Sequence, residues 1–146
     1  CLINGVVPEA QGSVHPNIAP YGDLLACSDG WMVLAVGNDR QFEALCRVLG
    51  HAEWAMRPEF ATNADRVTHR VELMALLTGV ARSGSRFYWD AAFQAAGVPA
   101  GVVRKLDEVF QPGSAGAAQL VSDEMGRRPN PVAYRMEWAQ AGNAMR

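Results

Sequence analysis

The sequence of 146 residues has the length and composition of one globular domain, since 49% of its residues are hydrophobic and 19% are charged. A net charge of −2 argues against a nucleic-acid partner, and we expect no membrane association because no apolar stretch could span a bilayer and no signal peptide is present. The three cysteines, Cys1, Cys27 and Cys46, fit neither a disulfide framework nor a zinc site, so we expect reduced thiols, no metal and a cytoplasmic location.

The chain begins with a segment rich in helix and strand breakers. Residues 1–22 hold three prolines and three glycines without periodicity, which predicts an extended arm. Two apolar runs follow, at 24–28 and 31–36, separated by Asp29 and Gly30. Both of these residues tolerate positive φ at the centre of a two-residue turn, so the pattern predicts a β-hairpin. The second run does not alternate, which predicts a strand covered on both faces.

A first helix is predicted directly after the hairpin. Asn38 stands at a capping position, and Gln41 follows three residues later in capping-box spacing. Gly50 is expected to end the helix. The predicted buried stripe is Phe42, Leu45, Cys46 and Leu49.

Two further helices are predicted before residue 100. The second opens with the pair Thr62 and Asp65 and runs to about Arg82, and the third covers about 85–96. In the second helix, Arg66 and Arg70 lie mostly off the apolar stripe. That stripe is Val67, Val71, Met74, Leu77 or Thr78, and Ala81.

After the third helix the sequence predicts only short elements. They are a strand at 102–103, one helical turn at 106–110, a loop at 111–118 and an edge strand at 120–121. The sequence therefore predicts an α/β (α+β) fold: a small antiparallel sheet built on the hairpin, with about three helices packed on it. We divide the chain into an arm at 1–22, a core at 23–125 and a divergent C-terminal tail at 126–146.

No familiar catalytic motif is present in the sequence. A nucleophilic cysteine is not expected, because Cys27 and Cys46 fall on apolar faces. Asp39 is the acidic residue that stands out, since it follows an apolar strand and a glycine at the first turn of a helix. Local pattern favours a simple role at the positive end of the helix dipole. We assign no catalytic residue and no metal ligand.

Several short motifs stand in order along the chain: HPNIAPYG at 15–22, DG at 29–30, LAVGND-x-QF at 34–42, FATN-x-x-RV-x-x-R-x-x-L at 60–73, Trp89, and GVPAG-x-V at 97–103. In this order and at this spacing they resemble the family III (CaiB/BaiF-type) CoA-transferases. The resemblance covers residues 12–110 and fades after about 118. The evidence for the resemblance is the ordered set of motifs, because each motif alone is common.

The resemblance implies that the chain is the small domain of such an enzyme. Complete relatives carry a large Rossmann-like domain, built from segments before and after the small one, and form interlocked dimers. Their transferases attack an acyl-CoA thioester with an aspartate of the large domain, and no position here corresponds to that nucleophile. CoA or acyl-CoA is then the expected substrate, with no covalently bound cofactor. A racemase branch instead exchanges an α-proton through acid/base residues.

Four residues of the matching motifs are carried over as candidates for a substrate cleft. Asp39 lies at or next to an acid that approaches the substrate in the racemase branch, and Asn38, His15 and Tyr21 are expected to face the domain cleft. Three functions remain open: part of a CoA-transferase or acyl-CoA racemase, a non-catalytic domain that self-associates or binds a partner such as a large domain, and a module with weak acyl-CoA affinity.

Overall fold

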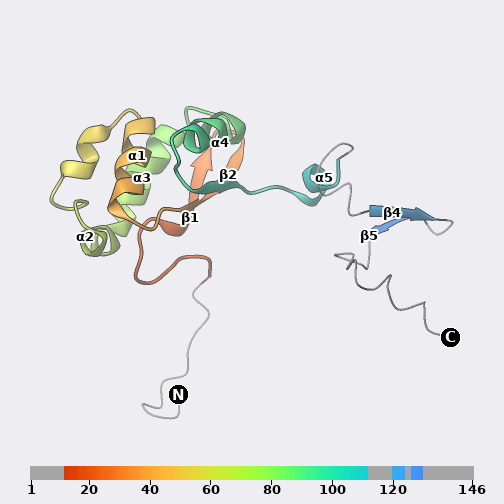
Figure 1. Ribbon diagram of the computed structural model, residues 1–146, viewed down its shortest axis with the longest axis horizontal. Coiled ribbons are helices and arrows are strands. Elements are labelled where there is room, and N and C mark those ends of the chain that lie inside the picture. The colour runs from red at the N-terminus through yellow and green to blue at the C-terminus, as the bar shows by residue number, and fades with distance from the viewer. Residues whose placement is uncertain (1–11, 112–119, 124–125, 130–146) are drawn as a thin grey trace, which may run out of the picture. The chain divides into compact units, whose positions relative to one another are not determined.

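The computed structural model describes residues 12–111, 120–123 and 126–129. Contacts within the chain group it into two units, residues 1–103 and 104–146. The first unit contains a three-stranded antiparallel sheet in the order β1 (Tyr21–Cys27), β2 (Gly30–Ala35), β3 (Ala100–Val102) (Figure 1). This confirms the small antiparallel sheet built on a hairpin.

Helices occupy the chain between β2 and β3. They are α1 (Asp39–Val48), the 3₁₀ helix η1 (Ala52–Met56), α2 (Asn63–Thr68), α3 (Arg70–Ala81) and α4 (Arg86–Ala95). Helix α3 packs against β1, and α4 packs against β2 and β3. The predicted fold class, a mixed α/β domain with helices on a small sheet, is confirmed.

The second unit is small within the described residues. It contains α5 (Leu106–Val109) and an antiparallel hairpin of β4 (Leu120–Asp123) and β5 (Gly126–Pro129). The helical turn and the strand at 120 were both predicted from the sequence. Most of the predicted arm, at 1–11, and most of the predicted tail, at 130–146, lie outside the described residues.

The β1–β2 hairpin is present, but its turn is centred one residue earlier than predicted. Cys27 pairs with Gly30, so the two central residues are Ser28 and Asp29. No described residue other than glycine has positive φ. The physical reason lies in α4: the Asp29 carboxylate accepts the backbone N–H of Arg86 at 2.7 Å, which fixes Asp29 against the start of that helix.

Strand β2 alternates in burial, so the prediction of a strand covered on both faces is wrong. Met32, Leu34 and Val36 are buried in the core, whereas Trp31 is 50% exposed. An apolar residue at nearly every position of this short strand therefore does not mean that both of its faces are buried. The helices cover one face, and the other face presents Trp31 and its neighbours to the surface.

The helix predictions differ in outcome. The stripe of α1 is confirmed, with Phe42, Leu45, Cys46 and Leu49 all buried. The second predicted helix is broken at His69, whose backbone is not helical (φ −101°, ψ 24°). The break rotates the following turn, so that α3 buries Leu73 in the core and leaves Val71 87% exposed. The predicted burial of Val71 is therefore wrong.

The start of β1 is locked against the segment before it. Gly22 has φ +76°, and a Cβ added there would collide with the backbone carbonyl of Ser13. The Ser13 hydroxyl donates to the Gly22 carbonyl at 2.7 Å, and the His15 N–H donates to the Tyr21 carbonyl at 2.9 Å. Residues 13–15 thus fold back onto the first residues of the sheet.

Candidate functional site

The loop that leads from β2 into α1 is closed by two reciprocal hydrogen bonds. Asn38 is the N-cap of α1, and its Oδ1 accepts the backbone N–H of Gln41 at 2.9 Å. The Gln41 Oε1 in turn accepts the backbone N–H of Gly37 at 2.8 Å. The predicted capping-box spacing is confirmed, although Gln41 reaches Gly37 rather than Asn38.

These two bonds determine which amide atoms remain free. A backbone N–H can only donate, so the atom that accepts from it must be the amide oxygen. Each NH₂ group of Asn38 and Gln41 is therefore left as a donor, and neither has a hydrogen-bond partner among the described residues. The loop exposes donors and keeps its acceptors internal.

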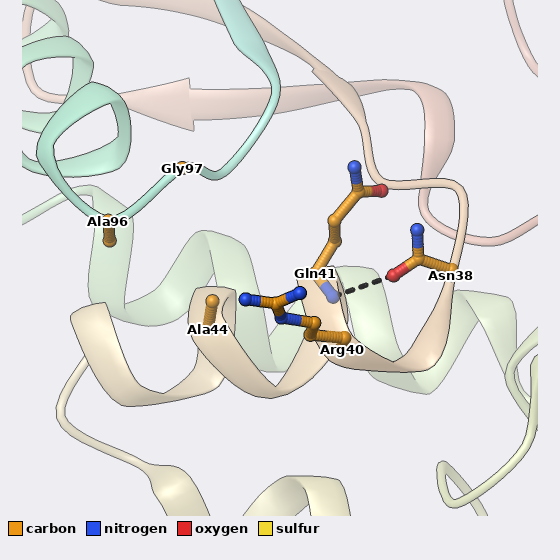
Figure 2. Close-up of a pocket in the computed structure, with 6 residues that line it drawn as sticks. All are labelled: Asn38, Arg40, Gln41, Ala44, Ala96 and Gly97. Carbon is orange, nitrogen blue, oxygen red and sulfur yellow. Dashed lines mark hydrogen bonds between the residues drawn. The ribbon is translucent and has the colours of Figure 1, made fainter.

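A pocket of about 270 Å³ lies beside this loop (Figure 2). Arg40, Gln41 and Ala44 of α1 line it together with the N-cap Asn38, and Ala96 and Gly97, which follow α4, line it from the other side. The Arg40 guanidinium forms no hydrogen bond or ion pair with any described residue. Two amide NH₂ groups, one guanidinium and the positive end of a ten-residue helix favour a ligand that carries anionic oxygens.

The acid next to the pocket is neutralised by a buried cation. Asp39 is the first residue of α1, and its Oδ1 accepts a hydrogen bond from Nη2 of Arg66 at 2.6 Å. The Asp39 side chain is 62% exposed, whereas that of Arg66 is 1% exposed. Since the carboxylate is paired, its charge opposes anion binding in the pocket less than an unpaired aspartate would.

Of the other two predicted cleft residues, Tyr21 lies beside the same loop and His15 lies next to Tyr21. A Cβ placed on Gly37 would stand 4.0 Å from Cε2 of Tyr21, so the Tyr21 ring borders the loop. The His15 ring meets Tyr21 edge to face, with ring centroids 5.7 Å apart. The structure thus places Tyr21 with Asn38 and Asp39, and His15 one ring further away.

The structure also contains a set of positioning residues that the sequence interpretation missed. Asn63 Oδ1 accepts the Ala19 N–H at 3.1 Å, and Arg66 Nε donates to the Ala19 carbonyl at 2.9 Å. Arg70 donates to the carbonyls of His15 and Ile18 at 2.7 and 2.8 Å. The spacing of Asn63 and Arg66 is a signal that could have revealed this pair, because residues at i and i+3 share one face of α2. Arg70 lies beyond the break at His69, so helical spacing does not place it on that face.

Arg70 also forms a largely buried ion pair. Its Nη1 contacts Oδ2 of Asp23 at 2.7 Å, and that same oxygen accepts the backbone N–H of Tyr21 at 2.9 Å. The segment 15–23 is therefore clamped from the side of α2 and α3 by charged groups. The clamp fixes the backbone that carries His15 and Tyr21.

The two described cysteines do not provide a nucleophile. Burial raises the pKa of the Cys46 thiol to about 12, and burial also raises the pKa of Cys27. Both thiols are free, as predicted, and both are buried. Since the thiolate is the reactive form, neither is activated at neutral pH. Within the described residues there is also no cluster of side chains that could bind a metal ion.

Comparison with solved structures defines the class of domain first. The crystal structure of a CAIB/BAIF family protein from Brucella suis superposes with a TM-score of 0.83 at 36% identity, covering 93% of this chain and 36% of that one. The mixed α/β domain described above therefore has the CaiB/BaiF fold. No helix of the described residues is both long and apolar enough to cross a membrane.

Sequence comparison then gives the family. The model of CoA-transferase family III matches residues 2–141, and the chain belongs to that family. It is 38% identical over 109 residues to the succinate–glutarate CoA-transferase of Agrobacterium fabrum, covering 75% of this chain and 27% of the relative. It is 33% identical over 130 residues to the acetyl-CoA:oxalate CoA-transferase of Acetobacter aceti, covering 88% and 33%. The chain thus spans about a quarter to a third of the length of these relatives.

Proposed function

We propose that the chain is the small domain of a family III CoA-transferase and that the Gly37–Gln41 loop, with Tyr21 beside it, forms one wall of the acyl-CoA cleft. The observation that carries the proposal is the pocket beside that loop, because Asn38, Arg40 and Gln41 offer it hydrogen-bond donors and a positive charge. The loop lies within one of the motifs that resemble the family.

The chemistry of the pocket fits the substrates of CoA transfer. The reaction moves CoA between an acyl-CoA and a carboxylic acid, so both donor and acceptor carry anionic oxygens. The two curated relatives above are named for succinate, glutarate and oxalate, all of which are dicarboxylates. A guanidinium and two amide NH₂ groups are donors suited to a carboxylate. We therefore propose transfer of CoA to a dicarboxylic acid in the complete protein.

We propose that the 146-residue chain does not catalyse this reaction by itself. In the resemblance described above, the nucleophilic aspartate belongs to the large domain. An acyl transfer needs a nucleophile fixed against the thioester, and loss of that positioning removes most of the rate. The small domain is then a contributor to substrate binding.

The experiment combines an activity assay with a binding assay on the purified chain. Incubation with succinyl-CoA and glutarate or oxalate, followed by mass detection, should give no new thioester. Titration of the ¹⁵N-labelled chain with succinyl-CoA should shift the amide signals of residues 37–41. Arg40→Met should weaken this response, whereas Arg47→Met, in the last turn of the same helix, should not.

Two results would contradict the proposal. Turnover above background would show that the chain is a catalyst on its own. Absence of any amide shift in the loop at millimolar succinyl-CoA would remove the binding role.

A second candidate function, self-association, is favoured by the open face of the sheet. The strand register places Tyr21, Leu24 and Trp31 on that face, and these side chains are 39%, 47% and 50% exposed. Apolar side chains gathered on one surface commonly mark an interface. We propose that two copies of the isolated chain associate through this face.

Sedimentation velocity tests the association. The chain should show a concentration-dependent dimer in the micromolar range, and Leu24→Lys should shift it towards monomer. Val71→Lys is the matched control, because Val71 is also an exposed apolar residue but lies on α3, outside that sheet face. A strict monomer at all concentrations rules the association out.

A further inference from the structure

Arg66 is the most deeply buried charged residue of the described chain. Its side chain is 1% exposed, yet it lies on α2, next to the surface loop that borders the pocket. Three of its nitrogens donate hydrogen bonds: Nε to the Ala19 carbonyl at 2.9 Å, Nη1 to the Phe60 carbonyl at 3.0 Å and Nη2 to the Asp39 carboxylate at 2.6 Å. The guanidinium also lies over the Phe42 ring, 4.5 Å from its centroid.

The three acceptors belong to three separate segments of the chain. Ala19 precedes β1, Phe60 precedes α2, and Asp39 is the first residue of α1. A planar guanidinium can serve three acceptors in fixed directions, which a lysine ammonium on a flexible stem cannot do in the same way. Arg66 therefore sets the relative placement of these segments.

Two of the segments carry the proposed wall of the acyl-CoA cleft: the start of α1 lines the pocket, and Tyr21 borders the loop beside it. Asp39 follows the N-cap Asn38 directly, so the bond from Arg66 restrains the first turn that presents Asn38, Arg40 and Gln41. Ala19 is two residues before Tyr21, and the adjoining Pro20 carbonyl accepts the Val36 N–H at 3.1 Å. One buried side chain thus restrains both the segment that leads into Tyr21 and the loop that the Tyr21 ring borders.

We propose that Arg66 is a positioning residue for the acyl-CoA cleft and that the Asp39 carboxylate is its counter-ion and not a proton-transfer group. This inference rests on the function proposed above. The Oδ1 of Asp39 accepts the hydrogen bond from Arg66, and this bond holds the start of α1 against Arg66. What the loop offers a ligand is then the donor set of Asn38, Arg40 and Gln41.

The test compares two substitutions of Asp39 that differ in shape and charge. Asp39→Asn removes the charge but keeps an oxygen able to accept from Arg66, whereas Asp39→Ala removes the acceptor. A positioning role predicts that Asp39→Asn binds succinyl-CoA within about twofold of the original chain and that Asp39→Ala binds about tenfold more weakly, a factor that corresponds to about 1.4 kcal/mol. Arg66→Lys should resemble Asp39→Ala.

Glu72→Ala supplies the matched control. Glu72 accepts a hydrogen bond from Arg57 at 3.1 Å, and Arg57 lies over the Phe60 ring, so this pair repeats the arginine–acid–aromatic arrangement away from the pocket. Its loss should leave the response of residues 37–41 unchanged. The exposed Asp39 side chain makes Asp39→Ala expected to fold, which keeps the test valid if Arg66→Lys does not.

A ligand-free measurement separates this inference from the proposed function. Hydrogen exchange at the Gly37 and Gln41 amides should quicken by about tenfold or more in Asp39→Ala and stay unchanged in Glu72→Ala, because these amides are bonded within the loop. Quicker exchange with no succinyl-CoA response in any variant would reject the function and support the positioning role. Unchanged exchange and binding in Asp39→Ala, or equal losses in Asp39→Asn and Asp39→Ala, would overturn the positioning role.

Discussion

Two buried layers of opposite chemistry meet on helix α1. Beneath the sheet lies an apolar layer that includes Leu45, Leu77 and Phe93. Beside the start of β1 lies a polar layer in which Arg66 and Arg70 bind backbone carbonyls and carboxylates. Phe42 belongs to both, because it is part of the apolar core and the Arg66 guanidinium lies over its ring. The apolar layer supplies stability, and the polar layer determines where the candidate cleft residues lie.

Removal of a large side chain from the apolar layer should have the greatest effect on stability. Phe93→Ala leaves a cavity in the centre of the core and should lower the free energy of unfolding by about 3–5 kcal/mol. Phe87→Ala, a half-exposed position on the same helix, should cost less than about 1 kcal/mol. Urea denaturation of both variants measures the difference, and equal losses would show that α4 does not bury Phe93 as described.

Loss of Arg66, the buried cation of the polar layer, should have the second largest effect on the free energy of unfolding. Arg66→Met leaves the buried carbonyls of Ala19 and Phe60 without their donor, and should lower the free energy of unfolding by about 3 kcal/mol. Arg40→Met, which removes an exposed guanidinium, should change it by less than about 0.5 kcal/mol. If the two arginine variants are equally stable in urea, the polar layer contributes nothing to folding.

A smaller effect is expected from the cap of the helix that the two layers share. Asn38→Ala removes the acceptor for the Gln41 N–H and should cost about 1 kcal/mol. Asn38→Asp keeps an acceptor at the same place and should be close to the original chain. Equal unfolding midpoints for the alanine and aspartate variants would contradict the described cap.

The smallest effect should come from a surface acid and appear only at low pH. The hydrogen bond from the Arg86 backbone N–H lowers the pKa of Asp29 below its usual 3.8. Since the folded-state pKa is the lower one, the stabilisation is present above about pH 4 and is lost as the pH falls through the folded value. The thermal midpoint should therefore drop less steeply below about pH 4 in Asp29→Asn than in the original chain.

In the apolar layer the sequence predictions had mixed success. Apolar spacing was sufficient for α1, where Phe42, Leu45 and Leu49 repeat along one face. It failed at Val71, because a break at His69 changed the phase of the helix, and no apolar pattern reports such a break. It failed for β2, because strand composition does not reveal whether a second layer covers the other face.

The candidate site was only partly visible in the sequence. Local pattern alone singles out Asp39, and the family resemblance adds Asn38 and Tyr21 as cleft candidates. The structure places Asn38 and Asp39 on one loop, with the Tyr21 ring beside it. Helical spacing places Arg66 off the apolar stripe, and a charged side chain at such a position is usually exposed, yet Arg66 is buried. Its burial depends on acceptors 47 and 27 residues away along the chain, and such long-range bonds cannot be read from local spacing.

The close approach of Ser13 to Gly22 has a consequence for natural variation. The space that any side chain would need at position 22 is filled by main-chain atoms, and the positive φ adds a second penalty. A library of all substitutions at this position, selected for folded protein, should return glycine almost alone. Glycine at position 22 is therefore required for residues 13–15 to pack against the start of the sheet.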